Sequence, residues 1–105
     1  SLVITSLPVS AGPDYFQLEM SRKLNAAKQK LKQAEAASAT QQQNLMKEHM
    51  AMMQEIVTKM ANTKPRADMT MQEHEEWIAE HQKLMDQVLN QMMEEHHLMM
   101  KSCKH

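Results

Sequence analysis

Apolar and small side chains recur at spacings of three and four residues along most of the chain, which is the period of a helix that packs along one face. The first series follows Asp14, which together with Gln17 is typical of a helix-capping pair. Its members are Met20, Leu24, Ala27, Leu31, Ala34, Ser38, Gln41 and Leu45. The pattern predicts one long helix over about 14–61.

The middle of this first series is weaker than its ends. Residues 36–43 are small and polar, and Thr40 with Gln43 resembles a second capping pair. The alternative to one continuous helix is therefore a kink in this stretch, followed by a new helical segment.

A second series begins after residues 62–68, which are rich in Asn, Pro and Asp and favour a reversal of the chain. Thr70 and Glu73 form a capping pair at its start. Its members are His74, Ile78, His81, Met85, Val88, Met92, His96 and Met99. The spacing predicts a second helix over about 70–101.

The predicted fold class is all-α, because two long helices joined by a short loop form an antiparallel helical hairpin over residues 13–105. A single Gly and three Pro exclude β-sandwiches and Gly-rich phosphate loops. A two-helix hairpin buries little apolar surface. We therefore expect it to dimerise into a four-helix bundle.

Residues 1–12 differ from the rest of the chain. They contain a short apolar run, too short to span a membrane, that is followed by small residues at 9–11 of the kind a signal peptidase reads. The segment is either a signal-peptide remnant or an N-terminal arm that packs through its apolar side chains. The first interpretation predicts an exported, periplasmic protein without a transmembrane segment.

The composition replaces aromatic residues with sulfur and imidazole. The chain has 13 Met and 6 His, but one Trp, one Tyr and one Phe. Its net charge of −1 gives no basic surface for nucleic acid. No spacing assembles a Ser/His/Asp or Cys/His constellation, so we expect no enzyme and no catalytic residues.

Two clusters place thioether and imidazole groups on a helix face at positions i, i+3, i+4 and i+7. The first cluster is Met46, His49, Met50 and Met53, and the second is Met93, His96, His97 and Met100, flanked by Met92 and Met99. Soft sulfur and borderline nitrogen donors suit Cu(I), and Ag(I) as its mimic, better than they suit zinc. Pairs at i, i+4 share one face of a helix. A hairpin that turns near residue 65 places His49 beside His81 or Gln82, and Met46 beside Met85. The candidate metal ligands are Met46, His49, Met50, Met53, His74, His81, Met85, Met92, Met93, His96, His97, Met99 and Met100.

Each ligand type also has a purely structural interpretation. Methionine is a flexible core filler and a good helix former. A histidine within a seam is commonly a core imidazole paired with a nearby Glu. The lone Cys103 is a free thiol, an intermolecular partner or an extra ligand beside His105, or it lies in a frayed tail.

Two short runs resemble known families. Residues 69–73 (Met-Thr-Met-Gln-Glu) resemble the Leu-Thr-x-x-Gln hallmark of the Spy/CpxP/CnrX group of periplasmic stress and metal-sensing proteins, with Met69 and Glu73 replacing the Leu and Gln. Residues 93–97 (Met-Glu-Glu-His-His) resemble the Met-x-x-His-His stretch of small Met/His-rich copper-tolerance proteins. Both resemblances imply the periplasm, and the second implies copper.

The sequence therefore predicts a periplasmic copper-binding protein that buffers, stores or transfers Cu(I), with a copper exporter or copper chaperone as a partner. The alternatives are a metal-independent periplasmic chaperone, whose Met-rich surface adapts to varied clients, and a structural helical subunit of a larger assembly. Uptake of Cu(I) separates the first hypothesis from the other two.

Overall fold

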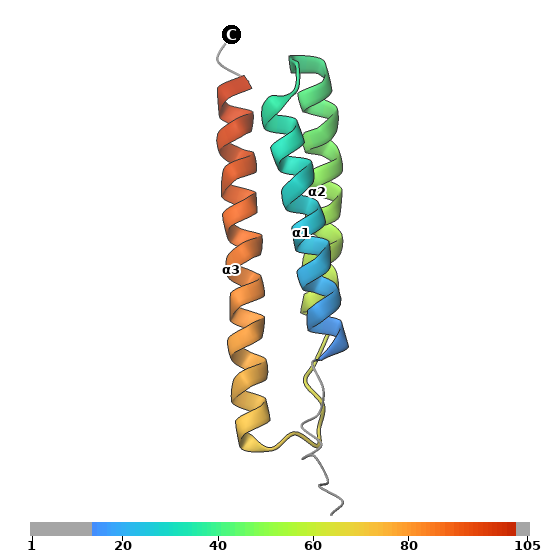
Figure 1. The fold of residues 1–105 in the computed structure, drawn as a ribbon, viewed down its shortest axis with the longest axis vertical. Coiled ribbons are helices and arrows are strands. Elements are labelled where there is room, and N and C mark those ends of the chain that lie inside the picture. Colours follow the sequence, from blue (N-terminus) through green and yellow to red (C-terminus); the bar gives the residue numbers. More distant parts are fainter. Residues whose placement is uncertain (1–13, 103–105) are drawn as a thin grey trace, which may run out of the picture.

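The computed structural model describes residues 14–102, which form three α-helices. They are α1 (Tyr15–Ala36), α2 (Ala39–Ala61) and α3 (Met71–Ser102). Figure 1 shows α1 and α2 as an antiparallel pair, with α3 running beside them in the direction of α1. The expected signal-peptide remnant or arm and Cys103 lie outside the described residues.

The all-helical class is confirmed, but the single helix expected over 14–61 is wrong. The chain reverses at Ala37 and Ser38, which both adopt extended backbone conformations, with ψ of 160° and 163°. The last turn of α1 finds a side-chain partner at this reversal, since the side-chain amide of Gln42 donates to the carbonyl of Ala34 at 3.0 Å. The two-helix hairpin is therefore replaced by three helices.

The two predicted helix starts are confirmed at Asp14 and Thr70. The Asp14 carboxylate accepts the backbone N–H groups of Phe16 and Gln17. Thr70 and Glu73 exchange reciprocal side-chain-to-backbone bonds of 3.1 Å, which is a complete capping box. Both bonding patterns satisfy N–H groups that a helix start leaves without intrahelical partners.

The core lies along the face of α1 that the periodicity predicts. Every member of the first series within α1 is buried: Met20, Leu24, Ala27, Leu31 and Ala34. Side chains of α2 and α3 complete the cluster, namely Met53, Ile56, Met60, Leu84 and Val88. Burying one large apolar side chain contributes roughly 1.5–3 kcal/mol, so this shared cluster is the main stabilising feature of the fold.

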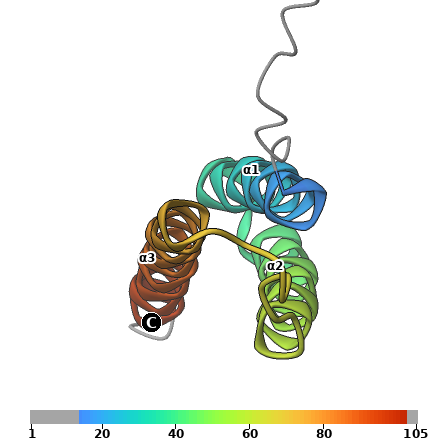
Figure 2. The same cartoon turned by 90° about the horizontal axis from the view of Figure 1, so that it is seen from below.

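The three helices do not contact one another equally. Helix α1 packs most extensively on α2, less on α3, and the contact between α2 and α3 is the smallest. Figure 2, which looks along the helices, shows α1 at the apex of the triangle with α2 and α3 extending away from it. Helix α3 is therefore held mainly through α1.

The buried face of α3 differs from the predicted one. Its buried seam consists of Trp77, Leu84, Val88, Gln91 and Glu95, continued by the half-buried Leu98. In the predicted series only Val88 is fully buried, whereas Met92 and His96 are exposed. The buried seam is displaced by one residue from the predicted series. This face is buried because Gln91 and Glu95 have polar partners inside the bundle.

Surface ion pairs join α1 to α2. Lys23 lies 2.9 Å from Glu55, and Lys30 lies 3.0 Å from Glu48. Hydrogen bonds from Lys23 and Lys59 lower the pKa of Glu55, and the bond to Glu55 raises the pKa of Lys23. Exposed pairs of this kind contribute little to stability, so they orient the hairpin more than they hold it together.

Candidate functional site

A buried polar network at His49 connects the three helices. The His49 side chain is fully buried, with Nδ1 2.6 Å from Oε1 of Glu95 and Nε2 2.9 Å from Oε1 of Gln91. The amide nitrogen of Gln91 in turn donates to the carbonyl of Leu24 at 2.9 Å. Residues of α2, α3 and α1 are thus linked in one chain of hydrogen bonds.

The hydrogen bond from Gln91 to Leu24 determines which atoms of Gln91 and His49 donate and which accept. Because the Gln91 amide nitrogen donates to a carbonyl, its oxygen faces His49 and accepts from Nε2–H. A second proton lies between Nδ1 of His49 and the Glu95 carboxylate. Both ring nitrogens are therefore engaged, which is the arrangement described by the alternative interpretation of a core imidazole paired with Glu.

The predicted first cluster is mostly packed into the core. Met46 and Met53 are buried, and only Met50 of this cluster is exposed. The expected neighbour of His49, His81, lies ten residues before Gln91, or about 15 Å along α3. His49 therefore packs opposite the second half of α3, and the predicted cluster of His49 with His81 and Met85 is not assembled.

His81 occupies a different environment. Its ring stacks on Trp77, with centroids 4.8 Å apart and planes inclined by 13°. Its Nδ1 atom is buried and has no hydrogen-bond partner among the described residues. No protein group of residues 14–102 therefore competes for this nitrogen, in contrast to both nitrogens of His49.

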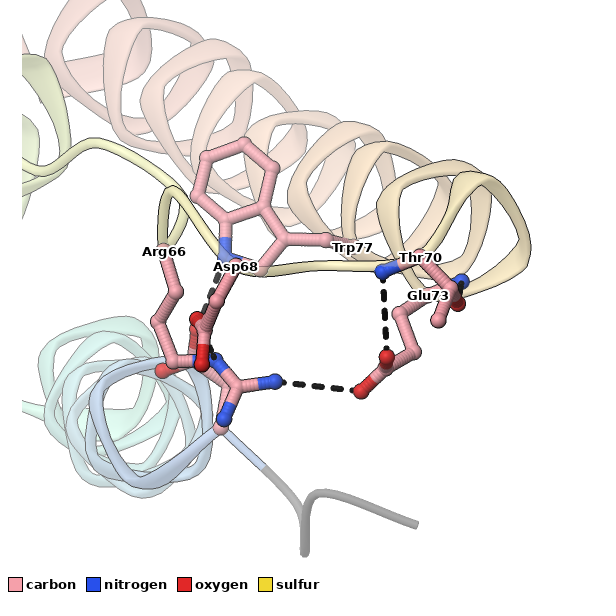
Figure 3. Close-up of polar contacts among 6 residues, drawn as sticks. Arg66, Asp68, Thr70, Glu73 and Trp77 are labelled. Atoms are coloured by element: carbon pink, nitrogen blue, oxygen red, sulfur yellow. Dashed lines mark hydrogen bonds and ion pairs between the residues drawn. The ribbon is translucent and has the colours of Figure 1, made fainter.

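The N-terminal end of α3 is built around Trp77. Its indole N–H donates to Oδ2 of Asp14 at 2.7 Å, and Arg66 lies 3.1 Å from Glu73 (Figure 3). Hydrogen bonds from the backbone and side chain of Thr70, together with Arg66, lower the pKa of Glu73. Each of these contacts has a structural role in holding the interhelical loop and the start of α3.

The second half of α3 carries six of the thirteen predicted ligands, and all six are exposed. Met92, Met93 and Met100 are 47%, 70% and 53% exposed, and His96 and His97 are also exposed. The exposed ligands form two adjacent rows with spacings i, i+4 and i+7: Met92, His96 and Met99, and Met93, His97 and Met100. Residues four apart are about 6 Å apart along a helix, so neighbouring donors in a row can reach one ion.

No group of three His, Cys, Asp or Glu side chains within residues 14–102 could hold a metal ion. His74, the remaining candidate, is half-buried in the first turn of α3.

Hydrophobic periodicity does not identify two residues of the buried network. Gln91 and Glu95 are polar, so hydrophobic periodicity assigns them to the surface. The signal that could have found them is the spacing of Trp77, Leu84 and Val88, which continues through positions 91 and 95 to Leu98. Two polar residues on that face require a buried polar partner, which His49 supplies.

No protein-family model matches the chain, and no curated protein or solved structure matches it. Within residues 14–102, none of the helices has both the length and the apolar character needed to cross a membrane.

Proposed function

We propose that the protein binds Cu(I) on the exposed second half of α3 and serves in the periplasm to buffer, store or transfer this ion. The observation that supports the proposal is the pair of Met–His–Met rows, all of whose members are exposed. Thioether and imidazole donors in such rows match the preference of Cu(I) for soft ligands.

Core packing accounts for the buried methionines but not for the exposed methionines of α3. Met20, Met53 and Met60 fill the space between the helices. Met93 and Met100 project into solvent, where a large apolar side chain brings no burial. A ligand role explains both their exposure and their spacing from His97.

The exposure of these Met and His side chains also suits the transfer of Cu(I) to another protein. An ion held on a helix surface can be passed to a copper exporter or copper chaperone by ligand exchange without opening the core. The metal-independent alternative rests on the same exposed side chains, because a flexible Met-rich surface can also bind apolar segments of client proteins.

The test is a titration with Cu(I) against a competing chelator. Replacing Met92, Met93, His96 and His97 together by Leu should abolish most of the uptake while far-UV circular dichroism remains helical, since Leu is a good helix former. The matched control is Met50→Leu, which removes an exposed methionine from α2 and should leave uptake unchanged. Full uptake by the fourfold variant would overturn the proposal.

A second measurement addresses the alternative. A metal-independent chaperone would suppress aggregation of an apolar client equally well with and without Cu(I). Such suppression, combined with no Cu(I) uptake by the wild-type protein, would establish the chaperone function instead.

A further inference from the structure

Helix α3 has a second seam beside its buried one. The exposed seam consists of Ile78, Met85, Leu89, Met92, His96 and Met99, each directly following a residue of the buried seam. These side chains are exposed, except for the half-buried Met85. Their successive spacings of seven, four, three, four and three are those of a coiled-coil interface, so α3 presents a surface suited to another helix.

The exposed seam is free of Asp, Glu, Lys and Arg from Ile78 to Met99. A helix face with this length and periodicity is matched best by another helix. Within the described chain Met85 packs against the core cluster. Packing there does not account for Ile78, Leu89 and Met92, which are exposed.

The donors along this face form an inverted repeat. His81 precedes Met85 by four residues, and Met92 precedes His96 by four, so the order His, Met, Met, His reads the same in both directions. Its midpoint lies between Val88 and Leu89. Two copies of α3 packed antiparallel about this midpoint would place the His81–Met85 pair of one copy opposite the Met92–His96 pair of the other.

We propose that a second copy of this chain docks antiparallel on the exposed seam and that the two copies jointly form two Cu(I) sites. Each site contains His81 and Met85 from one copy and Met92 and His96 from the other. The inference rests on the proposed function. Two sulfurs and two nitrogens make a four-donor set for Cu(I), and the symmetric interface generates the second site automatically.

A single chain cannot form this donor set. His81 and Met92 are separated by about 16 Å along one straight helix. An antiparallel copy removes this separation, because it reverses the order of the two pairs. His81 is suited to the role, since the Trp77 stack orients its half-buried ring beside the exposed seam.

The antiparallel arrangement is favoured over a parallel one. Parallel packing would align the two helix dipoles and bring the first turns of both α3 helices together, each with the acidic Glu73. Antiparallel packing places each first turn near the last turn of the other copy, which contains Lys101.

The test mixes two full-length variants. The first carries His81→Leu and Met85→Leu, and the second carries Met92→Leu and His96→Leu. Alone, each should lose the shared sites. Mixed in equal amounts, they should regain about a quarter of the lost uptake per chain, because half of randomly paired dimers contain one intact site. The amount of Cu(I) held by Met93 and His97 is the same before and after mixing. The increase in uptake per chain on mixing therefore measures the shared sites.

Three outcomes are informative. A gain on mixing, with a Cu(I)-dependent mass of twice 12.2 kDa for the wild type, supports the shared sites. Two results would overturn the antiparallel dimer and leave the proposed function intact. One is Cu(I) uptake by a wild-type protein that stays monomeric, and the other is no gain in uptake on mixing two variants that remain helical by circular dichroism. No uptake by the wild type overturns both.

The matched control changes the pair outside the repeat. A variant with Met93→Leu and His97→Leu should retain the Cu(I)-dependent doubling of mass. Loss of the doubling in this variant would show that dimer formation depends on the other row and would overturn the assignment of the repeat.

Discussion

Glu95 places a carboxylate oxygen 2.6 Å from Nδ1 of the fully buried His49, and this contact fixes α3 on the α1–α2 pair. Removing one partner of a buried pair leaves a polar or charged group without compensation. We expect Glu95→Ala to lower the free energy of unfolding by about 3 kcal/mol. Urea denaturation followed by circular dichroism measures this change.

Two further variants serve as controls for the stability change of Glu95→Ala. Glu94→Ala removes the exposed neighbouring carboxylate and should change stability by less than about 0.5 kcal/mol. Replacing His49, Gln91 and Glu95 together by Leu should cost less than Glu95→Ala alone, because no polar group remains buried without a partner. Equal stability of Glu95→Ala and Glu94→Ala would show that the network does not hold α3.

Asp14 supports two elements at once. Its carboxylate caps α1 and accepts the indole N–H of Trp77 at 2.7 Å. Asp14→Ala should destabilise the protein by about 2 kcal/mol, from a lost cap and a lost charged hydrogen bond. Fluorescence of the single Trp should report both the unfolding transition and the altered environment of the indole.

Ser38 provides the comparison for Asp14. It occupies the N-cap position of α2, but its side chain makes no capping hydrogen bond. Ser38→Ala should therefore change stability by only a few tenths of a kcal/mol, less than the roughly 1 kcal/mol typical of cap replacements. A loss as large as that of Asp14→Ala would contradict the assigned cap geometry.

Local signals in the sequence predicted local structure well. The capping residues at Asp14 and Thr70 and the buried face of α1 follow from patterns within a few residues, and the structure has each of them. At Ala37 the sequence pattern predicts at most a kink, whereas the structure has a full reversal of the chain. Neither Gly nor Pro marks it, and alanine favours helix, so tertiary packing of α1 on α2 decides it.

The surroundings of the candidate site are determined by contacts between residues that are far apart in the sequence. The periodicity of α3 is compatible with two faces one residue apart, and the choice between them rests on His49, which lies 46 residues from Glu95 in sequence. Apolar patterning cannot detect such a polar pair. The same shift of register moved Met92 and His96 from the predicted interior to the surface.

Glu73 makes the stability of the protein sensitive to acid. Its folded-state pKa lies below the ordinary value of 4.5, chiefly because the Thr70 backbone N–H binds the carboxylate. The unfolded chain takes up this proton first, so the contribution of Glu73 is complete above about pH 4.5 and is lost as the pH falls through the folded-state pKa. Unfolding measured between pH 5.5 and 3 should show this loss.

Glu73→Gln isolates that contribution. Glutamine can complete a capping box but does not titrate, so this variant should lose less stability than the wild type over the same range. Glu55 acts in the same direction, since Lys23 and Lys59 lower its pKa, and Glu55→Gln should flatten the curve further. Identical curves for wild type and Glu73→Gln would contradict the proposed cause.

Methionine oxidation should separate the surface from the core. Brief peroxide treatment converts exposed thioethers to polar sulfoxides, which are poor ligands for Cu(I). We expect Met93 and Met100 to react before Met20, Met53 and Met60, which are enclosed between the helices. Peptide mass spectrometry gives the order of reaction.

At the stage when only the exposed methionines are oxidised, Cu(I) uptake should fall while the helical signal persists, because the core is still intact. Met71→Leu is the matched control, since Met71 is exposed but lies outside the rows of α3 ligands. Its replacement should leave both uptake and the fall on oxidation unchanged. If uptake instead persisted until the buried Met53 reacted and the helices melted, the binding donors would lie in the core and not on the surface of α3.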